Sequence, residues 1–223
     1  MWITPSLWFK KSNSNIDRGL PNNTMQITKK RFLERIKQTS TFSTYDFFYN
    51  MSYVIIPEID TKGREDFFQM FYNCENLVTI PQLDTSNGTD FGYMFYNCKS
   101  LIKLPQLDTS NGTDFYYMFY NCGSLKTIST LNLSKGESFR YMFTGCYSLE
   151  NITIEGTIKI KSNDLNLSNS KKLTVDSIMS FINAFEDNTG EETQYTVTFG
   201  ATNLAKLTEE QIAIVTNKNI LLA

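Results

Sequence analysis

The chain has no histidine, and this absence narrows the chemistry that it can carry out. Histidine is the side chain whose ordinary pKa suits general acid–base catalysis near neutral pH, and it is the commonest metal ligand. The sequence also has no G-x-S-x-G motif, no phosphate-binding loop and no H-E-x-x-H motif. We therefore predict that the protein is not an enzyme and that it uses no cofactor.

Long apolar runs are absent as well. No stretch of about 18 apolar residues occurs, so no membrane-spanning helix and no membrane insertion are predicted. Residues 1–5 (MWITP) lack the basic start and the apolar stretch of a secretory signal. We expect the protein to stay in the compartment where it is made, or to leave it inside a larger particle.

Net charge is small, at −2, but it is divided unevenly along the chain. Residues 1–42 carry eight Lys and Arg against Asp17 and Glu34, and the remainder of the chain is acidic. A basic arm of this kind favours attachment to another particle or surface protein. Nucleic acid is not an expected partner, because a short basic segment is not a basic face on a folded domain.

The most prominent feature present is a repeat with a step of 24 residues. MFYNC stands at 70–74, 94–98 and 118–122, and the variant MFTGC stands at 142–146. A second pattern, L-x-x-I-P-Q-L-D-T, occupies 77–85, recurs with Leu for Ile at 101–109 and is looser at 125–133. A fixed period between 20 and 50 residues predicts a solenoid. A degenerate first copy is expected from about Phe47, with Asn50 at the cysteine position.

Each repeat predicts one strand and one short helix. The Leu-x-x-Ile-x-x-Leu part is expected to lie along a parallel ladder, followed by a turn at the TSNG sequence. Phe, Met, Phe and Cys then recur at i, i+3, i+4 and i+7, which is typical of a buried helix face. The residue before each cysteine is Asn or Gly, which suits a left-handed C-cap. The predicted fold class is an α/β solenoid with a parallel sheet on one face and short helices on the other.

We divide the chain into three parts. Residues 1–45 are interpreted as an N-terminal arm with a basic capping helix at Lys29–Gln38, residues 46–160 as the solenoid, and residues 161–223 as a C-terminal α/β cap. The cap is predicted to contain, in order, a helix within Leu173–Phe185 capped near Thr174, a strand at Tyr195–Phe199, a helix opened by a capping box at Thr208 and Gln211, and a strand near Ile220–Leu222.

The repeat places residues of one kind in columns, and two of these columns suggest ion binding or cross-linking. Cys74, Cys98, Cys122 and Cys146 form the first, which we interpret as buried, reduced core thiols and not as a metal site or disulfides, since no C-x-x-C pair is present. Asp60, Asp84, Asp108 and Asn132 form the second. Calcium binding is one interpretation of it, but turn capping by Asx side chains is favoured, because each coil supplies only one such side chain.

Aromatic residues supply the candidate binding sites. One column holds Tyr93, Tyr117 and Tyr141, and an adjacent column holds Tyr72, Tyr96 and Tyr120. Two interpretations stay open: an exposed aromatic ladder that binds sugar rings or a protein, or side chains that pack on one another and only stabilise the fold. Near the N-terminus, Trp2, Trp8 and Phe9 either cover the open edge of the solenoid or anchor the arm in a particle.

At the MFYNC and IPQLDTSNGTDF copies the chain resembles the BspA-type leucine-rich repeat family of bacterial and phage surface proteins, over about residues 46–155. The segment from Leu173 to Ala223, with TFGATNLAKLTEEQ, is similar to the terminal module of predicted phage and prophage tail or baseplate proteins. The resemblance implies a leucine-rich-repeat solenoid used for adhesion or recognition, and it carries no catalytic residues over to this chain.

These observations lead to one function and two alternatives. The leading hypothesis is a recognition module of a phage or phage-tail-like particle, with the arm attached to the assembly and the solenoid facing a host surface protein or glycan. The alternatives are a bacterial cell-surface adhesin of the same family and an intracellular protein-binding scaffold. A homo-oligomer is possible by analogy with other tail components, but the sequence does not fix the oligomeric state.

Overall fold

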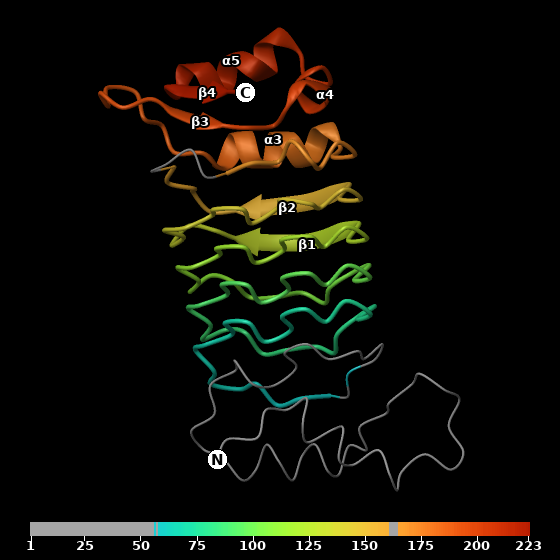
Figure 1. Cartoon of the computed structure of the whole chain (residues 1–223). Coiled ribbons are helices and arrows are strands. Elements are labelled where there is room, and N and C mark those ends of the chain that lie inside the picture. Colours follow the sequence, from blue (N-terminus) through green and yellow to red (C-terminus); the bar gives the residue numbers. More distant parts are fainter. Residues whose placement is uncertain (1–55, 57, 161–164) are drawn as a thin grey trace, which may run out of the picture.

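The fold is described by a computed structural model for residues 56, 58–160 and 165–223. Successive repeats lie one above another as flattened coils, and the C-terminal elements lie at the upper end of the stack (Figure 1). Residues 24 apart are neighbours between coils, as the parallel bridges from Asp66 to Asp90 and from Asp90 to Asp114 show. The predicted arm, its basic helix, the first repeat around Phe47 and the residues Trp2, Trp8 and Phe9 lie outside the described residues.

One side of the stack carries the first two strands. β1 (Thr127–Asn132) and β2 (Asn151–Glu155) pair in parallel and occupy the Leu-x-x-Ile-x-x-Leu part of their coils. In the coils below them the same part makes only isolated contacts, such as the bridge between Lys103 and Thr127. Pro81 and Pro105 explain the difference, because proline has no N–H to donate to a ladder. Ser129 takes the equivalent position in β1, and the strand continues there across a shift of register between Ile128 and Thr130.

The predicted helices on the opposite side are not formed; in the described residues the MFYNC segments are runs of tight turns. Alternate N–H groups bond to the next coil, as from Phe71 to the carbonyl of Met94 at 2.9 Å. The N–H of Tyr72 bonds three residues back to Gln69, at 3.0 Å. Gln69 and Asn73 have a positive φ of 56°, so every fourth residue interrupts a right-handed helix. The helix prediction was wrong because bonds between coils replace bonds along a helix.

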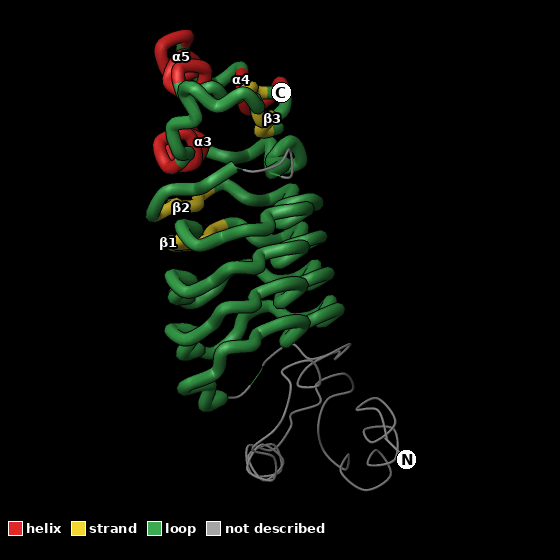
Figure 2. Tube along the Cα trace, turned by 90° about the vertical axis from the view of Figure 1, so that its left-hand side faces the viewer, coloured by secondary structure: helices red, strands yellow, loops and turns green. Residues whose placement is uncertain are grey.

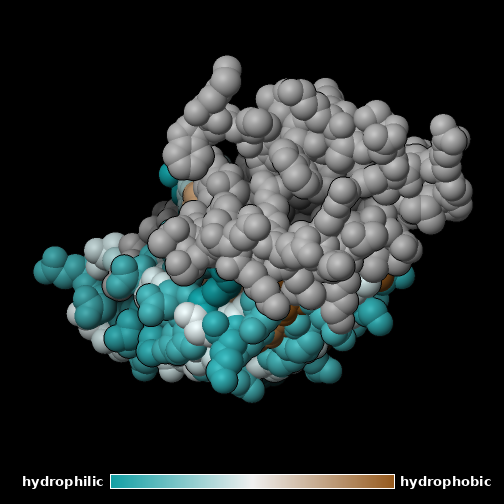
Figure 3. Space-filling model, turned by 90° about the horizontal axis from the view of Figure 1, so that it is seen from below, coloured by the Kyte–Doolittle hydropathy of each residue, from teal (hydrophilic) through white to brown (hydrophobic). Residues whose placement is uncertain are grey.

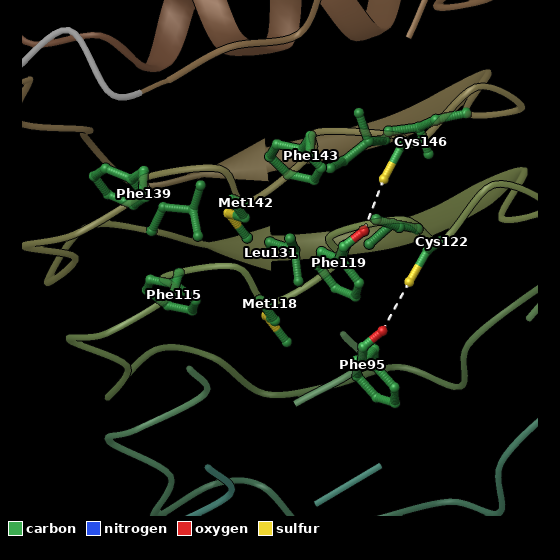
Figure 4. Packing of buried hydrophobic residues seen from close by; sticks show 14 of the residues in the cluster. Phe95, Phe115, Met118, Phe119, Cys122, Leu131, Phe139, Met142, Phe143 and Cys146 are labelled. Atoms are coloured by element: carbon green, nitrogen blue, oxygen red, sulfur yellow. Dashed lines mark hydrogen bonds between the residues drawn. The ribbon is translucent and has the colours of Figure 1, made fainter. Parts of the chain in front are cut away.

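Burial of the periodic residues is confirmed. The Phe, Met and Cys side chains of each described MFYNC or MFTGC segment are at most 1% exposed. Phenylalanine rings stack from coil to coil in two rows, Phe71, Phe95, Phe119 and Phe143 with centroids 5.3 to 5.8 Å apart, and Phe67, Phe91, Phe115 and Phe139 with centroids 5.5 to 5.9 Å apart (Figure 4). Each fully buried phenylalanine contributes about 1.5 to 3 kcal/mol of transfer free energy. The rings therefore form a continuous core along the stack.

The C-terminal elements follow the predicted order. They are α3 (Val175–Ala184, N-cap Thr174), β3 (Tyr195–Val197), α4 (Ala201–Leu204), α5 (Glu209–Asn217, with the capping box of Thr208 and Gln211) and β4 (Ile220–Leu222), and β4 pairs in parallel with β3. The helix at 175–184, the two strands and the capping box are confirmed. The four-residue helix α4 was not predicted.

Helix α3 closes the upper edge of β2, above which it lies in Figure 2. The N–H of Ile152 donates to Ser177 Oγ at 3.0 Å, and the N–H of Ile154 donates to Ser180 Oγ at 2.7 Å. Two serines three residues apart on the helix therefore face two N–H groups that are two residues apart on the strand. Their hydroxyls accept the hydrogen bonds that a further strand would otherwise accept at this edge. The ladder thus ends in a helix.

None of the helices in the described part of the chain is both long enough and apolar enough to cross a membrane.

Candidate functional site

The six tyrosines singled out from the sequence come together on the turn side of the stack. This tyrosine face consists of Tyr72, Tyr93, Tyr96, Tyr117, Tyr120 and Tyr141. Rings in equivalent positions lie 4.7 to 4.9 Å apart between centroids. The two columns also contact each other, as between Tyr93 and Tyr96 at 5.4 Å and between Tyr117 and Tyr120 at 5.1 Å. The two predicted columns are therefore one continuous layer of rings.

The backbone of one column is strained. Tyr93 and Tyr117 have a φ of 55° and Tyr141 a φ of 58°, in the left-handed region that bulky residues rarely adopt. The conformation costs about 1 to 2 kcal/mol at a residue with a side chain. Aromatic pairs contribute about 0.5 to 1.5 kcal/mol beyond their burial, and each interior ring has several partners. Ring stacking therefore offsets the strain that a tyrosine brings to this position.

An asparagine ladder borders the tyrosine face on one side. Asn97 Nδ2 donates to Asn73 Oδ1 at 2.8 Å, and Asn121 Nδ2 donates to Asn97 Oδ1 at 3.0 Å. These asparagines and Gly145 have positive φ, which confirms the left-handed position predicted for them, although it does not end a helix. At Gly145, where φ is 81°, a Cβ atom would lie 2.4 Å from Asn121 Oδ1, so glycine relieves both the strain and the contact.

A row of carboxylates, which the sequence interpretation missed, borders the other side. Asp66, Asp90 and Asp114 each accept a hydrogen bond at 2.8 Å from the N–H two residues on, at Phe68, Gly92 and Tyr116. Burial raises the pKa of Asp90 above its ordinary value; the bond from Gly92 opposes this, and the charges of Asp114 and Asp66 add to it. An Asp at the same step of 24, directly before a buried phenylalanine in three successive copies, was the available signal.

Access to the tyrosine face differs along the stack. Tyr141 is 36% exposed, whereas the lower tyrosines are partly buried. Tyr93 is enclosed by the edges of Phe68 at 5.7 Å and Tyr116 at 5.1 Å. Its pKa is raised by burial and by the hydrogen bond with Tyr116. Packing of the tyrosines on one another is confirmed, and their binding of a partner stays a prediction.

The upper end of the tyrosine face carries a cation. The guanidinium of Arg140 lies 4.9 Å from the centre of the Tyr141 ring, and its Nη2 atom donates to the Tyr141 hydroxyl at 3.2 Å. A guanidinium over an aromatic ring is attracted by the negative face of the ring. The last ring of the layer therefore already holds a positively charged group of the same chain.

The cysteine column belongs to the core. All four thiols are buried and unbridged, and Cys98, Cys122 and Cys146 each donate to a phenylalanine carbonyl of the coil below at 3.1 Å; two of these bonds are drawn in Figure 4. Burial raises the pKa of Cys146 to about 12, and those of Cys98 and Cys122 well above the ordinary value. Thiols that stay protonated are poor nucleophiles.

The other aspartate column caps turns, as predicted. Asp84 Oδ1 accepts the N–H of Ser86 at 3.2 Å and its hydroxyl at 2.7 Å, and these bonds lower the pKa of Asp84. Asp108 repeats the arrangement with Ser110. Within residues 56, 58–160 and 165–223, no group of three or more Cys, Asp or Glu side chains is placed to hold a metal ion.

The rest of the visible surface gives no second site of this kind. Seen from below, the described flank of the coils is mainly hydrophilic, with a few apolar side chains (Figure 3). Among the described large hydrophobic residues outside the tyrosine face, those that are exposed are Ile102, Tyr147, Ile214 and Leu221. Tyr147, at 59%, is the most exposed of them and lies 3.7 Å from where a Cβ of Gly123 would be.

Comparison with protein families gives one match. A family model described as "Mycoplasma protein of unknown function, DUF285" matches residues 39–157, which is more than half of the chain and includes every copy of the 24-residue repeat. Comparison with curated proteins found no match, and comparison with solved structures found none either.

Proposed function

The chain belongs to the DUF285 family, and we propose that it is a non-enzymatic recognition module of the leucine-rich-repeat type whose tyrosine face binds a partner at a bacterial surface. The observation that carries this proposal is the layer of partly exposed tyrosines, held on a rigid stack of coils. Tyrosine is enriched at protein interfaces because one side chain supplies a large contact area and a hydroxyl at little cost in conformational entropy.

Strain in the backbone supports the same proposal. Glycine or asparagine fits a left-handed position without penalty, yet three successive coils have tyrosine there. Part of the reason is stability, since the rings stack. Stacking between coils does not require the hydroxyl groups, because buried phenylalanines also stack from coil to coil, with centroids 5.3 and 5.6 Å apart. Phenol groups at a partly exposed layer are suited to contact with water or with a partner.

The setting of the module is part of the proposal. We place it on a phage or phage-tail-like particle, with residues 1–45 attached to other particle proteins, because residues 173–223 resemble terminal modules of tail and baseplate proteins. The order of elements predicted for that segment is confirmed, but the setting depends on the resemblance. The same recognition surface would serve a cell-surface adhesin, and detecting the protein in purified particles or in the cell envelope distinguishes the two.

The test compares two tyrosines of the same coil. Fluorescently labelled full-length protein is incubated with a panel of bacterial cells, and binding is measured for the wild type, Tyr141→Ala and Tyr147→Ala. Tyr141 belongs to the tyrosine face, whereas Tyr147 is more exposed and lies outside it, so the second variant is a matched control. We expect Tyr141→Ala to weaken binding about tenfold, the loss of one interface tyrosine of about 1.4 kcal/mol, and Tyr147→Ala to leave it unchanged.

The melting temperature of each variant is measured alongside. If Tyr141→Ala binds the cells that the wild type binds, with equal affinity and an intact fold, the tyrosine face is not the recognition surface. If the two variants weaken binding equally, the contact surface lies elsewhere on the upper coil.

A further inference from the structure

The two interior rings of the tyrosine face are already occupied on both faces. Tyr96 lies between Tyr72 at 4.7 Å and Tyr120 at 4.8 Å, and Tyr117 lies between Tyr93 at 4.9 Å and Tyr141 at 4.7 Å. These distances leave no room for another ring or sugar between neighbours. A pyranose recognised by an aromatic side chain lies flat on the ring, and neither face of Tyr96 or Tyr117 is open to it.

The top ring of the column of Tyr93, Tyr117 and Tyr141 is occupied in a different way. Tyr141 ends the layer at the top of the stack, and Arg140 holds its guanidinium 4.9 Å from the centre of that ring. A partner that meets the layer therefore contacts ring edges and hydroxyl groups. Phenol oxygens accept hydrogen bonds, and ammonium and guanidinium groups of proteins are strong donors without acceptor capacity.

Charge beside the layer has one sign along most of its length. Asp90 and Asp114 each accept a bond of 2.8 Å from the N–H two residues on, at Gly92 and Tyr116. Tyr116 in turn stands edge-on to the rings of Tyr93 and Tyr117, at 5.1 and 4.4 Å. The carboxylates thus lie beside the positions of Phe68, Gly92 and Tyr116, and the rings of Phe68 and Tyr116 contact Tyr93. The cations on this side of the described coils are Arg64, near Asp66, and Arg140 at the top of the layer.

The geometry points to a protein segment that bears lysine or arginine side chains, and not a glycan, as the partner of the tyrosine face. Its ammonium or guanidinium groups reach the carboxylates of Asp90 and Asp114 and the phenol oxygens beside them, while its apolar atoms lie against the ring edges. This inference depends on the proposed function and identifies the chemical class of the partner. It also follows the chain's own use of a guanidinium at Tyr141.

The experiment uses the full-length protein and two libraries in parallel, displayed random peptides of twelve residues and printed oligosaccharides. Selected probes are titrated by calorimetry against the wild type, against the double variant Asp90→Asn with Asp114→Asn, and against Asp84→Asn with Asp108→Asn. Asparagine keeps the oxygen that accepts each backbone hydrogen bond. The second pair removes the same charge from an aspartate column whose bonds go to Ser86 and Ser110, so it controls for net charge.

We expect the selected peptides to be rich in lysine and arginine and to bind more weakly as salt is added. The Asp90 and Asp114 variant should weaken their binding about three- to tenfold, the effect of two partly exposed charge pairs, and the control pair should leave it within about twofold. If both double variants weaken peptide binding equally, the effect comes from the net charge of the protein and not from the position of Asp90 and Asp114. That result would overturn the inference.

Failure of the inference and failure of the proposed function give different results. If oligosaccharides bind the wild type and lose affinity in Tyr141→Ala, the tyrosine face remains a recognition surface but the inference of a protein partner is overturned. Selected peptides without basic residues would also keep the tyrosine face, and they would overturn the inference of a basic partner. Peptides that bind Tyr141→Ala and the aspartate variants as well as the wild type would overturn both. Binding of neither library would also count against both.

Discussion

Removing the hydroxyls of Ser177 and Ser180 tests how the ladder ends. In the structure these hydroxyls are 3.0 and 2.7 Å from the N–H groups of Ile152 and Ile154, on the edge of β2 that α3 covers. Ile152 is 3% exposed and Ile154 is 8% exposed. In the double variant Ser177→Ala with Ser180→Ala, both N–H groups lose their acceptor while helix α3 remains above them.

The expected loss follows from those two donors. A buried donor left without a partner costs about 1 to 3 kcal/mol, so the two cost about 2 to 6 kcal/mol. Alanine is the better helix former by a few tenths of a kcal/mol at each position, which lowers the net loss to about 1 to 5 kcal/mol. That range is a large fraction of the 5 to 15 kcal/mol typical of a folded domain. We expect a correspondingly lower urea midpoint.

The assay combines urea unfolding with amide hydrogen exchange at Ile152 and Ile154. Both amides should exchange faster in the double variant, whereas amides in the lower coils should lose protection only as far as global stability falls. Ser168→Ala is the control, because its hydroxyl bonds to Asn166 at the exposed surface, and it should change stability by no more than about 0.5 kcal/mol. A double variant as stable as the wild type, with both amides still protected, would refute α3 as the closure of the ladder.

Four further predictions concern the columns. Burial raises the pKa of Asp90, so the folded state binds its proton more tightly, and the stability of the protein falls as pH rises through the raised pKa. Asp90→Asn should therefore stabilise the protein at pH 7 but not below the pKa of the unfolded side chain. Urea unfolding at each pH measures this difference. Asp84→Asn should destabilise the protein at pH 7, because the lowered pKa of Asp84 contributes stability above the unfolded pKa that is lost as pH falls. Equal behaviour of the two variants would contradict both the raised pKa of Asp90 and the lowered pKa of Asp84. At the left-handed Tyr117, the glycine variant should be more stable than the alanine variant by about 1 kcal/mol in thermal unfolding, and the reverse order would show that φ is not positive there. The Cys122 thiol, buried and with a raised pKa, should react with a thiol reagent only at the rate of unfolding, and fast labelling of the native protein would contradict its burial.

The sequence alone determined which residues are equivalent and which of them are buried. A strict step of 24 makes residues such as Cys98 and Cys122 neighbours between coils, whatever secondary structure lies between them. The capping signals at Thr174 and Thr208 were also readable, because a cap depends on a side chain and a backbone group only three residues apart. These features are local or follow from translation along the stack.

The helix prediction shows where sequence reasoning stopped. Phe, Met, Phe and Cys at helical spacing are buried on one side, as in a helix, but the periodicity cannot tell whether an N–H bonds within its own segment or to the next coil. Coil stacking decided this, since the N–H of Phe71 has the carbonyl of Met94 within 2.9 Å. Likewise the absence of proline at Ser129 became informative only once the neighbouring strand was known.

The tyrosine face divides in the same way. That six tyrosines line up was determined by the period of the sequence, because translation by one coil brings each onto the next. The tertiary structure decided that Tyr96 and Tyr117 are stacked on both faces and that Tyr93 is enclosed while Tyr141 is exposed. It also decided that Asp90 and Asp114 bond to the N–H groups of Gly92 and Tyr116. The physical reason is that burial and electrostatics depend on distances between coils, which only the packed stack sets.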